Sequence, residues 1–311
     1  MQPRIIFMGT PDFAVPSLRI LVETGYDVVA VVTATDKMGG RGGKKLLQSA
    51  VKRYAVEQGI PVLQPRNLKA PEFIEELASY KADLQVVVAF RMLPVAVWDM
   101  PSLGTFNLHG SLLPKYRGAA PINWAVIRGE AETGVTTFFI QHEIDTGDLI
   151  FQESMPIGPN ETVGEVHDRM MSLGAETVLK TVHAIAAGTV ETQQQDHSQA
   201  TPAPKLKAEN TKINFSLSAK EVHNFVRGLN PYPGAWTMFG DQKWKILRTA
   251  LVEGESQLDP GTILTDNKSY LRVSTCEGLV EVLELQVPGK RRMAVRDFLN
   301  GSDFEQGACF Q

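Results

Sequence analysis

Short apolar runs alternate with amphipathic segments along the first part of the chain. The runs at 4–9, 28–33 and 84–90 are continuous stretches rich in β-branched residues, each followed by turn residues, which is typical of buried parallel strands. The segments 15–25 and 46–59 between these runs have a helical pattern, and each ends on a glycine. This order predicts an α/β fold with a Rossmann-like, doubly wound and mainly parallel sheet.

Two further strands and a long helix are predicted to complete this sheet domain. Residues 105–110 and 136–141 have strand character, and 163–188 has the pattern of a helix. The first turn, GTPDFA at 9–14, occupies the place of a dinucleotide-binding loop but lacks the second and third glycines of that motif, and Pro11 removes a backbone donor. The sequence therefore disfavours a nicotinamide dinucleotide.

The pattern changes after residue 188. Residues 189–207 are polar, contain a glutamine run and prolines, and show no amphipathic period, which indicates a linker. A helical stretch at 218–229 then precedes several short alternating segments, which predict a small β-barrel similar to an oligonucleotide-binding fold. We therefore expect a sheet domain at 1–188, a linker at 189–207 and a C-terminal barrel domain at 208–311.

The composition predicts a cytoplasmic protein. Residues with hydrophobic side chains make up 43% of the 311 positions, and no apolar run approaches the roughly 20 residues that a membrane helix needs. The first residues resemble a strand and a turn and not a signal peptide. Cys276 and Cys309 are too few for a disulfide framework or a cysteine-built metal site, so we expect a reducing compartment and no metal.

Charge is distributed unevenly along the chain. The formal net charge of −4 argues against a generally basic coat for nucleic acids. Basic residues cluster locally instead, at 39–45, 243–248 and 289–292. Such clusters are most often solvated surface, so by themselves they demonstrate no polyanionic partner.

Three polar residues form the strongest chemical signal. Asn107 and His109 are two positions apart on a predicted strand, so they project from one face at the end where open α/β sheets bind ligands. Asp145 lies in a loop after another strand. Acyl transfer is helped by an amide that donates to a developing oxyanion and by an imidazolium held by a carboxylate, and these three residues supply both. For these residues alone a simpler interpretation is that His109 is a histidine with satisfied hydrogen bonds at a strand end and that Asp145 forms a turn. Because no serine or cysteine elbow accompanies them, direct transfer is favoured over a covalent intermediate.

Longer motifs extend this signal. NLHGSLLPKYRGAAPINWAVIRGE (107–130) and TGVTTFFIQHEIDTGDLI (133–150), with GTPDFA at the start, resemble the folate-dependent formyltransferase family. The resemblance covers nearly the whole chain, including NPYPGAW (230–236). It implies that Asn107, His109 and Asp145 are catalytic and that residues 111–118 are the signature loop of the family.

The resemblance also implies a co-substrate, 10-formyltetrahydrofolate, and no metal. The implied folate contacts come from three loops: Phe90, Arg91, Met92, Leu93, Ser111, Leu112, Leu113, Pro114, Gln141, His142 and Ile144. The family often has a tyrosine and a glycine where this chain has Phe90 and Arg91. Arg91 therefore bears on the conformation of the folate loop.

The acceptor that the resemblance implies is the α-amine of methionine on initiator tRNA, bound by a monomeric enzyme. The implied phosphate contacts lie in the glycine-rich segment after the second strand and in the barrel: Arg41, Lys44, Lys45, Lys243, Lys245, Arg248, Lys290, Arg291 and Arg292. A relative that formylates a small amine, such as a glycinamide or amino-sugar nucleotide, is the nearest alternative, and a noncatalytic RNA-binding adaptor is another. DKMGGRGGKK (36–45) together with GTPDFA distinguishes a tRNA substrate from a small one.

Overall fold

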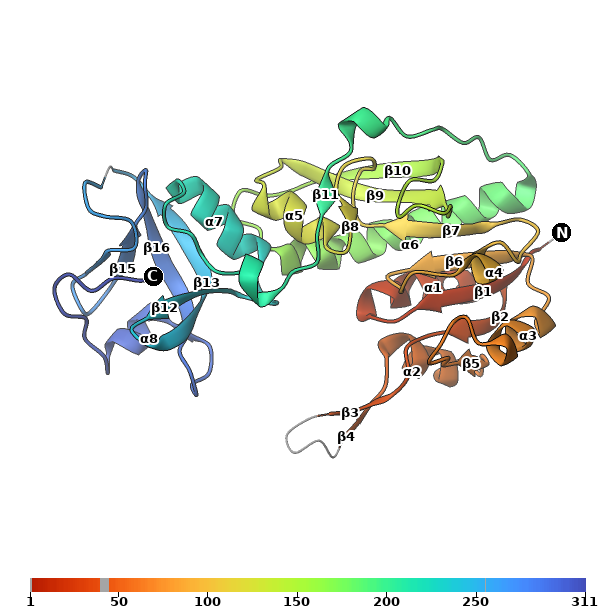
Figure 1. Ribbon diagram of the computed structural model, residues 1–311, viewed down its shortest axis with the longest axis horizontal. Helices are drawn as coiled ribbons and strands as arrows, with labels where there is room; N and C mark the ends of the chain where they lie inside the picture. Colours follow the sequence, from red (N-terminus) through yellow and green to blue (C-terminus); the bar gives the residue numbers. More distant parts are fainter. Residues whose placement is uncertain (1, 40–44, 255) are drawn as a thin grey trace. The chain divides into compact units, whose positions relative to one another are not determined.

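The computed structural model describes residues 2–39, 45–254 and 256–311, and the chain forms two compact units (Figure 1). Unit 1 comprises Met1–Gly118, Gly134–Met155 and His167–Pro202, and unit 2 comprises Ala119–Thr133, Pro156–Val166 and Ala203–Gln311. Two short segments that precede residue 167 therefore belong to the same unit as the C-terminal residues.

Unit 1 is built on a mainly parallel sheet, whose described strands lie in the order β10-β9-β7-β6-β1-β2-β5 (Figure 1). β1 pairs in parallel with β2 and β6, β6 pairs in parallel with β7, and β9 is antiparallel to β7. The bounds are β1 (Arg4–Gly9), β2 (Asp27–Val32), β5 (Val62–Leu63), β6 (Leu84–Val88), β7 (Thr105–His109), β9 (Glu132–Phe139) and β10 (Leu149–Pro156). The predicted Rossmann-like sheet is confirmed.

The central strands are buried on both faces. Ile5, Ile6, Phe7 and Met8 of β1 are fully buried, which explains why this run is continuously apolar and does not alternate. The helices that follow the strands are α1 (Val15–Glu23), α2 (Ala50–Glu57), α3 (Pro71–Ser79), α4 (Val95–Trp98) and α6 (Val163–Ala187), with a short 3-10 turn η1 (Asp12–Ala14). Their apolar sides pack against the strands, as with Phe73 and Leu77 of α3.

The second predicted helix is shorter than expected. Residues 45–47 form β4 (Lys45–Leu47), which pairs antiparallel with β3 (Lys37–Gly39), and α2 begins only at Ala50. Ser49 ends the extended segment because its hydroxyl accepts a hydrogen bond from the Lys52 N–H at 3.0 Å, the usual arrangement of a helix N-cap. The prediction of a helix from residue 46 is therefore wrong by about one turn.

The polar segment after α6 is ordered by hydrogen bonds within unit 1. Gln193 and Leu149 exchange two backbone hydrogen bonds, at 2.8 and 3.0 Å. The segment then contains the 3-10 turn η2 (His197–Gln199) and the short strand β11 (Pro202–Ala203), which pairs with β8 (Arg117–Gly118). Because polar contacts hold these residues, the segment needs no apolar face, and its sequence therefore shows no amphipathic period.

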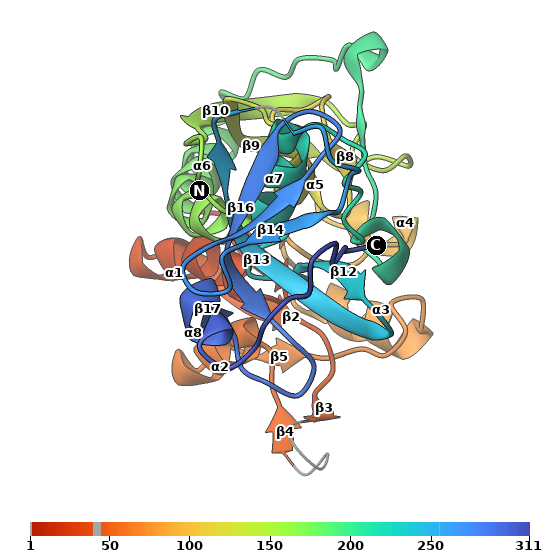
Figure 2. The ribbon, with the colours of Figure 1, turned by 90° about the vertical axis from the view of Figure 1, so that its left-hand side faces the viewer.

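Unit 2 contains the predicted barrel. Its described strands lie in the order β12-β13-β16-β15-β14, β17 pairs with β16, and the pairings are antiparallel (Figure 2). The bounds are β12 (Ala235–Phe239), β13 (Gln242–Val252), β14 (Ile263–Thr265), β15 (Leu271–Ser274), β16 (Leu279–Gln286) and β17 (Met293–Ala294). The expectation of a small C-terminal β-barrel is confirmed.

Residues 308–311 close this barrel. The N–H of Ile263, the first residue of β14, donates to the Ala308 carbonyl at 2.8 Å, while Met238 of β12 and Gln311 exchange two hydrogen bonds at 3.1 and 3.0 Å. Both otherwise open edges therefore pair with one segment. Inside, Trp244 contacts Phe298, Phe304 and Phe310 with ring centroids 5.2 to 6.0 Å apart.

Two helices of unit 2 pack closely against each other. α7 (Ala219–Gly228) begins with a capping box between Ser218 and Glu221, and α5 (Pro121–Ile127) contacts it. A Cβ at Gly228 would lie 2.5 Å from the Ile127 side chain, so glycine permits this approach. The remaining elements are η3 (Ala208–Asn210) and α8 (Val295–Leu299).

Candidate active site

Asn107 and His109 lie at the carboxyl end of β7, in unit 1. Asn107 pairs in register with Val87 of β6 and Phe138 of β9, so it lies inside the sheet and not at an edge. Its side chain is half-buried, and within the described residues no group forms a hydrogen bond with its amide. The amide is therefore available to a ligand at this strand end.

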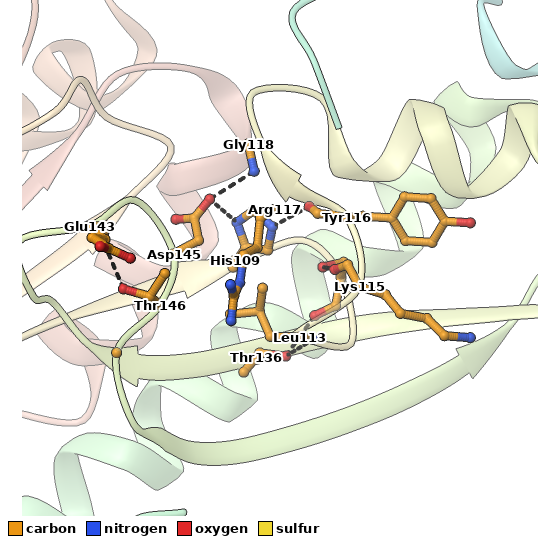
Figure 3. Close-up of polar contacts among 12 residues, drawn as sticks. His109, Leu113, Lys115, Tyr116, Arg117, Gly118, Thr136, Glu143, Asp145 and Thr146 are labelled. Atoms are coloured by element: carbon orange, nitrogen blue, oxygen red, sulfur yellow. Dashed lines mark hydrogen bonds and ion pairs between the residues drawn. The ribbon is translucent and has the colours of Figure 1, made fainter. Parts of the chain in front are cut away.

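His109 is 5% exposed and has a partner for each ring nitrogen (Figure 3). Nε2 lies 2.8 Å from the Tyr116 carbonyl oxygen. Because a carbonyl only accepts, Nε2 carries a hydrogen and donates it. Nδ1 lies 3.8 Å from Asp145 Oδ2, which is too long for a hydrogen bond but close enough for an ion pair with a protonated ring. A carboxylate and a carbonyl oxygen therefore face the two nitrogens of the His109 ring.

Asp145 is fixed by contacts on both its side chain and its backbone (Figure 3). Its Oδ2 accepts a hydrogen bond from the Gly118 N–H at 2.8 Å, and its φ of +56° is in the left-handed region. Gln195 Nε2 donates to the carbonyls of Asp145 and Gly147, at 2.9 and 2.8 Å. The carboxylate is therefore directed at His109 by a loop that is itself held in place.

The signature loop, residues 111–118, is tied to the strands beneath it. Thr136 Oγ1 donates to the Ser111 carbonyl at 2.6 Å and accepts from the Leu113 N–H at 3.1 Å (Figure 3). The Tyr116 N–H donates to Thr201 Oγ1 at 2.9 Å. These contacts fix the position of the Tyr116 carbonyl, which accepts the hydrogen bond from His109.

Several contacts at this site were not identified from the sequence. Gln195 accepts a hydrogen bond from Arg117 Nε at 3.2 Å, and with Thr201 it belongs to the segment that was interpreted as a linker. A polar run without a period gives no signal of such a role. Gly147 is required because a Cβ there would lie 1.7 Å from the Phe139 carbonyl oxygen.

The predicted folate residues fall into three groups according to their exposure. Arg91, Met92, Gln141, His142 and Ile144 are exposed, while Phe90, Leu112 and Pro114 are half-buried. Leu93, Ser111 and Leu113 are buried, and Ser111 Oγ already donates to the Lys115 carbonyl at 2.6 Å. Their side chains shape the loops, and the exposed group offers surface to a ligand.

Two of the three predicted folate loops meet in one apolar cluster. Phe90 and Ile140 pack on the same core cluster as Trp98, and the Trp98 ring meets the His142 ring edge-on at 5.7 Å. Arg91 donates hydrogen bonds to the carbonyls of Pro65 and Arg66, so it joins the loop after β6 to the loop after β5. Although Arg91 as a whole is exposed, partial desolvation of its guanidinium lowers the pKa of this group from its ordinary value.

The predicted tRNA contacts differ in their surroundings. Arg41 and Lys44 lie outside the described residues, and Lys45 is exposed on β4. In unit 2, Arg248 forms an ion pair with Glu165 at 3.1 Å and Arg292 forms one with Glu284. Lys243 Nζ lies 3.9 Å from the centre of the Trp236 ring, and Lys245 Nζ donates to the Pro233 carbonyl. Lys290 and Arg291 are exposed.

Comparison with known proteins decides the family. Residues 3–182 match the family described as formyl transferase, and residues 205–303 match the formyl transferase C-terminal domain. The methionyl-tRNA formyltransferase of Bacteroides thetaiotaomicron is 50% identical over 313 residues, which cover 98% of this chain and 97% of that protein. The corresponding protein of Phocaeicola vulgatus is 53% identical over 308 residues, with 96% and 95% covered. The chain belongs to the methionyl-tRNA formyltransferase family.

This formyltransferase also shares its fold with solved structures. The sugar 3N-formyltransferase WlaRD, solved with dTDP and 5-N-formyl-THF, has a TM-score of 0.68 at 20% identity, and the match covers 94% of this chain and all of that one. HypX from Aquifex aeolicus, in complex with tetrahydrofolic acid, has a TM-score of 0.62 at 19% identity and covers 96% of this chain and 47% of that one.

The described residues contain neither a candidate metal-binding cluster nor a candidate membrane-spanning helix. No group of three or more His, Cys, Asp or Glu side chains in the formyltransferase has the arrangement needed to hold a metal ion, as far as the structure describes the chain. Over the same residues, no helix is both long and apolar enough to span a membrane.

Proposed function

We propose that this enzyme transfers a formyl group from 10-formyltetrahydrofolate to the α-amine of methionyl-initiator tRNA. The observation that carries the proposal is the combination of about 50% identity over nearly the full chain to methionyl-tRNA formyltransferases with the Asn107, His109 and Asp145 arrangement. Folate derivatives in the solved structures of WlaRD and HypX support the donor.

The reaction is a direct acyl transfer. The unprotonated amine attacks the formyl carbon, the carbonyl electrons move to the oxygen, and a tetrahedral oxyanion forms. The bond from that carbon to the folate nitrogen then breaks, and this nitrogen takes up a proton as it leaves, while the former amine loses one through water near Asp145. Esterification of methionine lowers the basicity of its amine, so a useful fraction is unprotonated near neutral pH.

Asn107 is the group best placed to stabilise the oxyanion. Its amide is unengaged within the described residues and lies at the strand end, whereas both nitrogens of His109 already face partners. His109 acts first through the charge of its imidazolium, which Asp145 maintains. A direct hydrogen bond from His109 to the oxyanion requires one of its two contacts to open.

The folate and tRNA sites are assigned to different parts of the chain. The exposed residues of the loops at 90–93 and 141–144 receive the pterin, beside the cluster that contains Phe90 and Trp98. The cations of the β3–β4 hairpin and of the barrel bind tRNA phosphates without reading sequence. On this proposal the enzyme acts as a monomer in a bacterial cytoplasm.

A small amine is the second candidate acceptor, because WlaRD is a sugar formyltransferase with the same fold. The experiment that decides is a comparison of acceptors. Purified enzyme receives 10-formyltetrahydrofolate with charged initiator tRNA, glycinamide ribonucleotide or an amino-sugar nucleotide, and product formation is measured. We expect formylation of the charged tRNA alone; formylation of an amino-sugar nucleotide at a comparable kcat/KM would overturn the proposal.

A further inference from the structure

The β3–β4 hairpin, taken as residues 37–39 and 45–47, has little support from the body of unit 1. It reaches away from the sheet in both views (Figures 1 and 2). Its large apolar side chains are exposed: Met38 by 64%, Leu46 by 53% and Leu47 by 46%. Since these side chains do not anchor the hairpin, its direction must be set at its base.

A polar network lies at that base. Lys52 Nζ of α2 donates to Asp36 Oδ2 at 2.6 Å and to Gln64 Oε1 at 2.8 Å. Gln64 Nε2 donates to Asp36 Oδ1 at 2.8 Å and to the Ala34 carbonyl at 2.6 Å. Asp36 directly precedes β3, so three separate segments of the fold hold the first strand of the hairpin.

The second strand of the hairpin is held at its base as well. Ser49, two residues after β4, shares a hydrogen bond of 2.8 Å with Thr33 Oγ1 and also caps α2. The Lys52 and Asp36 side chains are only 17% and 18% exposed, whereas those of the Arg4 and Asp27 pair are 48% and 53% exposed. Hydrogen bonds from Lys52 and then Gln64 lower the pKa of Asp36, so this carboxylate stays charged near neutral pH.

We propose that Asp36, Lys52 and Gln64 are positioning residues that fix the direction of the β3–β4 hairpin for charged tRNA, an inference that rests on the proposed function. A hairpin whose base is fixed gives up little conformational freedom when it meets its ligand. If the network is lost, the hairpin has to be ordered when tRNA binds, and this loss of conformational freedom weakens tRNA binding. The chemistry at Asn107 is built from other residues. The folate loop meets the same segment only through the Arg91 hydrogen bonds to the backbone carbonyls of Pro65 and Arg66, in which the Gln64 side chain takes no part.

Gln64→Leu tests this without changing the charge of the protein. It removes both the acceptor for Lys52 and the two donated hydrogen bonds. We expect the KM for charged initiator tRNA to rise roughly tenfold, with kcat and the KM for folate within about twofold of wild type. Gln58→Leu, at an exposed position after α2, is the matched control and leaves all three constants unchanged.

Hydrogen exchange separates positioning from a general loss of stability. In Gln64→Leu, the amides of residues 37–39 and 45–47 should exchange faster, while those of β1 and β6 keep their protection. Lys52→Met should speed exchange at the same amides, and Lys52→Arg should keep part of the protection that Lys52→Met removes. Faster exchange throughout unit 1 would mean that the network only stabilises the fold, and the inference would be overturned.

A hairpin variant, Met38→Ser with Leu46→Ser, distinguishes a failure of the positioning role from a failure of the proposed function. If it raises the KM for charged tRNA and Gln64→Leu adds nothing further to it, the two act through one element, as proposed. If the hairpin variant raises this KM and Gln64→Leu alone does not, the positioning role fails while the proposed function stands. If the hairpin variant leaves it unchanged, the hairpin does not meet tRNA and both this inference and that part of the proposed function fall.

Discussion

At the scale of single residues, Asn107 differs from its neighbours because its amide is the uncommitted donor at the end of β7. We predict that Asn107→Ala slows single-turnover formylation roughly a hundredfold, or about 3 kcal/mol, the usual cost of losing one oxyanion donor. Affinity for charged tRNA should not change. Asn300→Ala, at an exposed position after α8, serves as the control, and a near wild-type rate in Asn107→Ala would exclude the oxyanion role.

Asp145→Asn isolates the charge from the structure. Asparagine tolerates the left-handed φ of +56°, and its side-chain oxygen can still accept from the Gly118 N–H, so the melting temperature should change little. An amide cannot hold an imidazolium as a carboxylate does, so we expect most of the activity to be lost. A pH–rate profile measures this; an active variant whose profile matches wild type would contradict the role.

The sequence predicts Asn107, His109 and Asp145 as the central residues of the candidate site, but it does not predict the residues that hold them. Asn107 and His109 were recognisable because a period of two on a strand places both on one face. Gln195 and Thr201 were not, because they act through hydrogen bonds to the loops at 145–147 and 111–118 across long separations in the chain. Neither composition nor periodicity records such contacts.

At the scale of secondary-structure elements, a strand could be predicted from the sequence where both of its faces are buried. The strand β1 was clear because both of its faces are buried, whereas β10 alternates between buried and exposed positions and was not among the predicted strands. The β3–β4 hairpin was missed because its stability comes from backbone pairing and from the Asp36 network, and not from an apolar face.

The segment after α6 carries a prediction of its own. Gln195→Leu leaves the carbonyls of Asp145 and Gly147 without their donor, which typically costs about 1–3 kcal/mol for buried groups. We expect faster hydrogen exchange at 145–147 and a lower kcat. Gln199→Leu, in the exposed turn η2, should leave both unchanged. If Gln195→Leu exchanged and reacted like wild type, the segment would not support the site.

In unit 2, α7 contains a buried histidine with a consequence for pH. Burial, and then the charge of Arg227, lowers the pKa of His223 below its ordinary value of 6.5. The folded protein therefore keeps this ring neutral where the unfolded chain already binds a proton, so the free energy of unfolding should fall as pH decreases below about 6.5. The melting temperature of His223→Gln should decline less between pH 7 and pH 5 than the melting temperature of the wild-type protein. Equal declines in variant and wild type would assign the acid sensitivity elsewhere.

At the scale of the whole molecule, the cations predicted to bind tRNA are not equivalent. Arg248 and Arg292 are paired with Glu165 and Glu284, whereas Lys290 and Arg291 are exposed in the turn before β17. We predict that Lys290→Ala with Arg291→Ala reduces the log–log salt slope of tRNA binding by up to about one unit per lost contact, and that Arg248→Ala changes it less. A salt series of binding measurements decides; an unchanged slope in the double variant would mean that these two side chains are solvated surface.

The interleaving of the two units limits how this protein can recombine with its relatives. A chimaera joined anywhere in residues 189–207 would inherit α5 from one parent and α7 from the other, because α5 lies in the N-terminal part of the chain and packs in unit 2. The Ile127 side chain would then have to fit beside a foreign residue at position 228, and the Asn123 amide would have to find the carbonyl there. Exchange of unit 2 between family members therefore requires segments 119–133 and 156–166 to be exchanged together with the C-terminal residues.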